Sequence, residues 1–265
     1  MDYENVCYIS RVMINDIPAL FICNRNQEIK PIVFVFHKFL QNKESELPIG
    51  YKLARENFFV VIFDLHGHGE RNNSYEYSGR YDFNNLYKDI FKTADDIKTV
   101  LEYLASFHKK TLSFSDIACV GTSIGANVAL IAGYLNNEIK KIVSLLGSLD
   151  WEYTAKNNRF ELLKYHSFSR KLMEFSKVKD DIAQYDPINN YDKVDVLPQM
   201  IFLNGLLDMV SPIESVKQSY EKLKRIYTNA DKGNLIELKT YSRVGHQVSY
   251  EMMNDTIQWL KGNNI

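Results

Sequence analysis

The 265-residue chain lacks any apolar stretch close to the ~20 residues that a membrane-spanning helix needs. Its first residues, Met1-Asp2-Tyr3-Glu4-Asn5, lack the basic region and apolar core of a signal peptide. Cysteine is scarce as well: Cys7, Cys23 and Cys119 are widely separated, and none belongs to a Cys-x-x-Cys pair. These absences exclude a disulfide framework and a cysteine-based zinc site, and they predict a cytoplasmic protein with reduced thiols.

No excess of one charge sign is present either. The chain has 32 Lys and Arg against 33 Asp and Glu, a net charge of −1, so we expect neither nucleic acid nor an anionic membrane as a partner. Internal repeats, low-complexity tracts and long linkers are also missing. A hydrophobic content of 45% can bury a large core. The sequence therefore predicts a single domain over residues 1–265, and it leaves the oligomeric state open.

Short apolar runs alternate with amphipathic segments along the chain. Residues 3–23 predict an antiparallel hairpin. Continuous apolar runs such as Ile32–Phe36 and Phe58–Phe63 are typical of strands buried on both faces of a parallel sheet. Further strands are expected at 117–120, 142–146, 200–203 and 235–241, and helices at 47–57, 86–104, 124–133, 213–226 and 249–260. This alternation predicts an α/β fold, with a mostly parallel central sheet and helices on both faces.

Residues 150–185 interrupt the alternation. They are rich in aromatic and charged residues and lack an obvious strand. We interpret them as a short helical cap inserted between two core strands. Their aromatic side chains either line a pocket for an acyl or aryl group or form the core of the cap itself.

The segment Gly121-Thr122-Ser123-Ile124-Gly125 lies between an apolar strand and a helix of small and aliphatic residues. Gly-x-Ser-x-Gly in this setting is typical of a sharp turn that exposes a nucleophilic serine. Glycine is expected on both sides of the serine because side chains there would collide where backbone passes backbone. The alternative is a glycine-bordered turn with an inert serine.

An acid and a histidine follow two later strands. Asp208 comes after the strand at 200–203, and His246 comes after the strand at 235–241. Parallel sheets hold their chemistry at the carboxyl ends of the strands, so both residues should lie near Ser123. The histidine would take the serine proton and then protonate the leaving group, and the aspartate would orient the histidine. Each residue alone is more often a turn or surface residue.

Taken together, these motifs resemble those of α/β-hydrolases of the dienelactone-hydrolase-like group, in particular small bacterial carboxylesterase-like proteins. The resemblance covers most of the chain. It rests on His37-Lys38-Phe39 with Lys43-Glu44, Asp64 to Arg71, Gly121 to Gly125, Gly205 to Pro212, and Gly245-His246. It implies an α/β-hydrolase fold with Ser123, Asp208 and His246 as catalytic triad. It also implies that the backbone N–H groups of Ile124 and Phe39 form the oxyanion hole.

Two features of these motifs need separate interpretation. Where the family has glycine, this chain has Lys38. Either the loop is strained or displaced there, or Lys38 points to solvent and changes nothing. His66 and His68 beside Asp64 suggest a metal site, but no third cluster of ligands accompanies them, and we expect no metal or cofactor.

The sequence therefore predicts a serine hydrolase that cleaves carboxylic esters or thioesters of small to medium substrates through an acyl-enzyme. Two alternatives remain. One is a hydrolase-fold protein that only binds a ligand or partner. The other is an acyltransferase or peptidase that uses the same triad.

Overall fold

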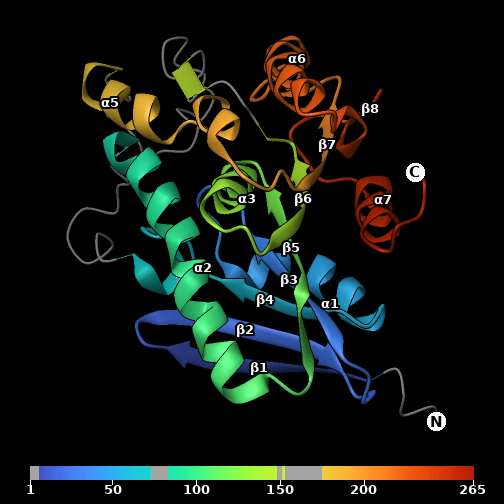
Figure 1. The fold of residues 1–265 in the computed structure, drawn as a ribbon. Coiled ribbons are helices and arrows are strands. Elements are labelled where there is room, and N and C mark those ends of the chain that lie inside the picture. Colours follow the sequence, from blue (N-terminus) through green and yellow to red (C-terminus); the bar gives the residue numbers. More distant parts are fainter. Residues whose placement is uncertain (1–5, 73–82, 148–150, 153–174) are drawn as a thin grey trace.

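The computed structural model describes residues 6–72, 83–147, 151–152 and 175–265. Within these residues the chain forms an eight-stranded sheet with the strand order β1-β2-β4-β3-β5-β6-β7-β8 (Figure 1). The strands are β1 (Cys7–Ile14), β2 (Ile17–Asn24), β3 (Lys30–Phe36), β4 (Phe59–Phe63), β5 (Leu112–Thr122), β6 (Ile139–Leu145), β7 (Gln199–Gly205) and β8 (Ile236–Tyr241).

The sheet is antiparallel at its N-terminal edge and parallel elsewhere. β1 and β2 form the expected hairpin, with Ile14 opposite Ile17, and β2 pairs antiparallel with β4. All other pairs, from β4 through β3 to β8, are parallel. In the hairpin turn Asn15 has a φ of 53°, a left-handed conformation that asparagine adopts more readily than most residues. The predicted fold class is confirmed.

Helices cover both faces of the sheet (Figure 1). They are α1 (Leu47–Arg55), α2 (Leu86–His108), α3 (Ile124–Leu135), α5 (Phe175–Tyr185), α6 (Ile213–Asn229) and α7 (Tyr250–Leu260). Short 3-10 helices are η2 (Lys43–Glu46), η3 (Gly69–Arg71), η4 (Phe83–Asn85), η6 (Pro187–Asn189), η7 (Tyr191–Lys193) and η8 (Gly233–Leu235). Within the described residues, no helix is long and apolar enough to cross a bilayer.

Alternation along the strands divides the core into two layers. In β3, Phe34 belongs to the layer beneath α2 and α3, whereas Val33 and Val35 belong to the layer beneath α1 and α7. Successive strand side chains point to opposite faces, so an uninterrupted apolar run such as β3 supplies both layers. Burial of this apolar surface is the main force that holds the helices on the sheet.

Most of the predicted cap lies outside the described residues, including all of 153–174. Its last part forms α5, which packs beside α2. Val178 and Ile182 of α5 are buried in the core, and the rings of Tyr185 and Phe91 stack with centroids 4.1 Å apart. Trp151 is also buried and stacks on Tyr87 of α2.

Candidate active site

Ser123 occupies a sharp turn between β5 and α3. Its φ of 57° and ψ of −114° are strained for a residue with a side chain. Its amide donates to the carbonyl of Leu145 at 2.8 Å, which ties the turn to the end of β6. A Cβ on Gly121 would lie 2.0 Å from the carbonyl oxygen of Gly125, and one on Gly125 would lie 2.3 Å from that of Phe36. Glycine is therefore required on both sides of Ser123, for the reason the sequence suggested.

Ser123, His246 and Asp208 lie in one hydrogen-bonded series. His246 Nδ1 lies 2.8 Å from Asp208 Oδ2, and His246 Nε2 lies 2.9 Å from Ser123 Oγ. A carboxylate can only accept, so Nδ1 carries the hydrogen and Nε2 is left to accept the serine hydroxyl proton. The Asp208 side chain is fully buried, whereas that of His246 is 22% exposed. This series can transfer a proton away from Ser123.

The loops that follow β7 and β8 fix the positions of Asp208 and His246. Asp208 Oδ1 accepts from the amides of Val210 at 2.8 Å and Ser211 at 2.9 Å, which fixes the carboxylate. The Leu207 amide donates to the carbonyl of Val244 at 2.9 Å, so the two loops are joined directly. A Cβ on Gly205 would lie 2.1 Å from that same carbonyl oxygen.

The segment after β3 carries the second expected oxyanion donor, Phe39. His37 at its start is fully buried; its Nε2 accepts from the Leu65 amide at 3.1 Å, and its Nδ1 donates to the Lys38 carbonyl at 2.9 Å. Burial lowers the pKa of His37 to about 3, so the ring is neutral at physiological pH. The first expected donor, Ile124, begins α3, and an amide at that position has no acceptor within its own helix.

Lys38 does not occupy a glycine-only conformation. Among the described residues of this loop the non-glycine residue with positive φ is Leu40, at 59°. Lys38 therefore does not need the conformational freedom of glycine.

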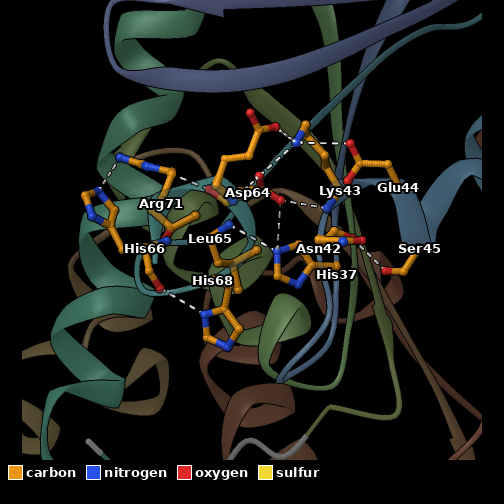
Figure 2. A network of polar contacts seen from close by, with 12 residues as sticks. His37, Asn42, Lys43, Glu44, Ser45, Asp64, Leu65, His66, His68 and Arg71 are labelled. Carbon is orange, nitrogen blue, oxygen red and sulfur yellow. Dashed lines mark hydrogen bonds and ion pairs between the residues drawn. The ribbon is translucent and has the colours of Figure 1, made fainter. Parts of the chain in front are cut away.

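A buried charge cluster joins the loop after β3 to the loop after β4 (Figure 2). Asp64 is fully buried and accepts from the Lys43 amide at 2.8 Å, from Lys43 Nζ at 2.9 Å and from the Glu70 amide at 3.1 Å. Lys43 Nζ also pairs with Glu70 and, at 3.1 Å, with Glu44. Burial alone would lower the pKa of the Lys43 ammonium, but hydrogen bonds to Glu70, Asp64 and Glu44 outweigh it and raise the pKa. Lys43 and Asp64 belong to the motifs that carry the family resemblance, but the sequence alone predicts no role for either residue.

His66 and His68 contribute to the loop after β4. His66 Nε2 lies 2.7 Å from Arg71 Nη2 and 3.0 Å from Asp96 Oδ2, and Arg71 Nη1 donates to that same carboxylate oxygen at 2.6 Å. His68 Nδ1 lies 2.9 Å from the His66 carbonyl oxygen. These contacts attach the loop to α2, which carries Asp96. In the part of the chain that the structure describes, no group of three or more His, Cys, Asp or Glu side chains is arranged to hold a metal ion.

The protein has an α/β-hydrolase fold: its sheet is mostly parallel, helices cover both faces, and a strained serine turn follows β5. Comparison with known proteins supports this assignment. The chain belongs to the prolyl oligopeptidase family, whose model matches residues 49–262. It is therefore a member of a hydrolase family.

Individual proteins that resemble this chain share only a modest part of its sequence. The protein named "Putative esterase YitV" of Bacillus subtilis (strain 168) is 24% identical over 267 residues, which cover 96% of this chain and 98% of that protein. The Pyrococcus furiosus esterase Pf2001 has the same fold, with a TM-score of 0.66 at 20% identity over 98% of this chain and 94% of that one. A Klebsiella pneumoniae structure titled "Putative Dienelactone Hydrolase" has a TM-score of 0.67 at 16% identity over 97% and 98%. The resemblance to this superfamily is confirmed.

Proposed function

We propose that this protein is a serine hydrolase that cleaves carboxylic esters or thioesters of small to medium substrates through an acyl-enzyme. Ser123 is the nucleophile, His246 the general base and acid, and Asp208 the residue that orients His246. The observation that carries the proposal is the hydrogen-bonded series from Ser123 Oγ through the imidazole to the Asp208 carboxylate.

The reaction proceeds in two halves. The Ser123 oxygen attacks the ester carbonyl carbon while its proton moves to His246 Nε2. The imidazolium, stabilised by Asp208, then gives that proton to the departing alcohol or thiol, and the acyl group stays on the serine oxygen. In the second half a water molecule loses its proton to His246 and attacks the acyl-enzyme, which releases the acid and restores Ser123.

The negative charge on the carbonyl oxygen is stabilised by two backbone amides, those of Ile124 and Phe39. The positive end of the α3 dipole supports the first of them. Loss of one such donor typically costs about 3 kcal/mol in the barrier. The neutral His37 ring and the buried Lys43–Asp64 pair hold the two ends of the segment that carries Phe39.

Peptide or amide cleavage is the second candidate, and the family match favours it, because the family is named for an oligopeptidase. The same triad would act, with an amine as leaving group. Comparing 4-nitrophenyl acetate with 4-nitroacetanilide, and then a panel of aminoacyl 4-nitroanilides, separates the two activities. Acyl transfer is detected by adding an alcohol or amine acceptor and measuring the partition against water.

A fluorophosphonate probe tests the nucleophile. We expect it to label the wild type and not Ser123→Ala, whereas Ser106→Ala, which alters an exposed serine on α2, should label normally. A burst of 4-nitrophenol equal to the enzyme concentration would establish the acyl-enzyme. No labelling together with no burst on any chain length from acetate upward would favour a hydrolase-fold protein that only binds a ligand.

A further inference from the structure

A cavity of about 310 Å³ lies beside the proposed catalytic residues. Lys38, Thr122 and Gln247 line it, and each is the direct chain neighbour of a proposed site residue. Ile49 of α1 and Met253 of α7 also line it, so the cavity lies on the face of the sheet that these two helices cover. The cavity therefore lies next to the segments that carry Ser123, His246 and Phe39.

Lys38 gives the cavity a positive charge. Its side chain is half-buried and has neither a hydrogen bond nor an ion pair with the residues that the structure describes. A partly desolvated ammonium that is not hydrogen-bonded to a carboxylate favours the approach of an anion. The ordinary backbone conformation of Lys38 leaves this side chain as the feature that distinguishes the position.

Glu46 is the other ionisable side chain among the described residues that line the cavity. Burial raises the pKa of its carboxyl to about 7, against the opposing effect of the nearby Lys38 ammonium. Below pH 7 Glu46 is therefore mostly neutral, and the lining has a net positive charge. Neutral hydrogen-bonding groups complete the lining, from Gln41, Ser45, Thr122 and Gln247.

We propose that this cavity is a substrate subsite for a carboxylate group, with the Lys38 ammonium as its ion-pair partner. The enzyme then prefers esters that carry a carboxylate over uncharged esters of the same shape. This inference rests on the proposed ester hydrolysis and adds a substrate class to it.

Two matched substrate pairs test the subsite. On the acyl side, mono-4-nitrophenyl adipate is compared with 4-nitrophenyl hexanoate; on the alcohol side, 4-acetoxyphenylacetate is compared with 4-ethylphenyl acetate. In each pair a carboxylate replaces a methyl group. At pH 6 we expect kcat/KM to be roughly three- to tenfold higher for the charged member of at least one pair, as for a partly shielded ion pair.

Variants attribute that preference to Lys38. Lys38→Met should remove it, whereas Lys38→Arg should retain it. The matched control is Lys140→Met, which removes an exposed lysine at the start of β6, the opposite end of a parallel strand from the cavity, and should leave the ratio as in the wild type. Each variant is first shown to melt cooperatively.

The pH dependence of the ratio gives an independent readout. The substrate carboxylates stay ionised from pH 6 to 8.5, whereas Glu46 loses its proton across this range and then competes for Lys38. The preference should therefore decline as pH rises, and Glu46→Gln should flatten that decline.

The outcomes separate the two proposals. Ester hydrolysis without preference for the charged member of either pair, or a preference that survives in Lys38→Met, would overturn the subsite and leave the hydrolase intact. Hydrolysis of no ester at all, with no fluorophosphonate labelling, would overturn both.

Discussion

Lys43→Met gives the sharpest test of how the loops around the site are held. The Lys43 side chain is 1% exposed, and its ammonium pairs with the fully buried Asp64 carboxylate. Methionine keeps the length and apolar stem but removes the charge, so the Asp64 carboxylate retains, among the described residues, the amides of Lys43 and Glu70 as donors. Removing one partner of a buried pair typically costs 3–5 kcal/mol, and the remaining donors set the expectation at the lower end, about 3 kcal/mol. For a chain of this size that is a fall in Tm of roughly 6–12 °C.

The assay is urea unfolding followed by circular dichroism, with kcat and KM measured on the folded variant. Because the pair fixes the end of the segment that carries Phe39, we expect kcat to fall by up to ~100-fold, the worth of one oxyanion donor, while KM changes much less. Asp64→Asn should lower the free energy of unfolding less in the Lys43→Met background than in the wild type, because in that background it removes a carboxylate that has lost its ion-pair partner.

A surface pair provides the matched control. Lys261 and Glu56 also form an ion pair, but their side chains are 39% and 40% exposed. Lys261→Met should cost less than ~1 kcal/mol and leave kcat unchanged. If Lys43→Met were equally mild in both stability and kcat, the argument that the buried cluster holds the oxyanion segment would be refuted.

Three further predictions concern single residues. Asp208→Asn should lower kcat by about 10⁴-fold with little change in thermal stability, since asparagine can still accept from the Val210 and Ser211 amides; kinetics and a melting curve check both. Gly125→Ala should unfold or inactivate the protein because its Cβ would lie 2.3 Å from a backbone oxygen, and the yield of soluble, cooperatively melting protein measures this. His37→Gln should reduce the loss of stability in acid. The unfolded chain takes up a proton near pH 6.5, whereas the buried ring does so only near 3, so the stabilisation is complete above pH 6.5 and is lost as pH falls towards 3. Between pH 7 and 5 the wild type should lose about 2 kcal/mol more than the variant in urea unfolding.

Each of these outcomes can contradict the reasoning. An Asp208→Asn enzyme with wild-type kcat would remove the aspartate from the proposed mechanism. A stable and active Gly125→Ala would mean that the serine turn is looser than its geometry indicates. Parallel acid profiles for His37→Gln and wild type would mean that the ring is protonated in the folded protein.

Local patterns in the sequence were sufficient to predict much of the fold. The continuous apolar run at Ile32–Phe36 predicted a doubly buried strand, because each successive side chain needs an apolar partner on its own face, and β3 supplies both layers of the core. The glycines around Ser123 were predictable for a similar reason, since the tight turn is a property of five consecutive residues. Strand β5 begins at Leu112, earlier than its apolar run suggested, because Leu112 and Ser113 also pair with β3, ahead of a register shift that precedes Ile117.

The sequence by itself determined the sheet, the serine turn and the order of three chemically suitable residues, since each depends on neighbours in the chain. Only the tertiary structure decided that Asp208, His246 and Ser123 lie within hydrogen-bond distance, because the spacing depends on how the loops after β7 and β8 pack. The structure alone also decided the role of Lys43. A lysine in a polar loop is ordinarily solvated, and its burial follows from the Asp64 carboxylate at the end of another strand.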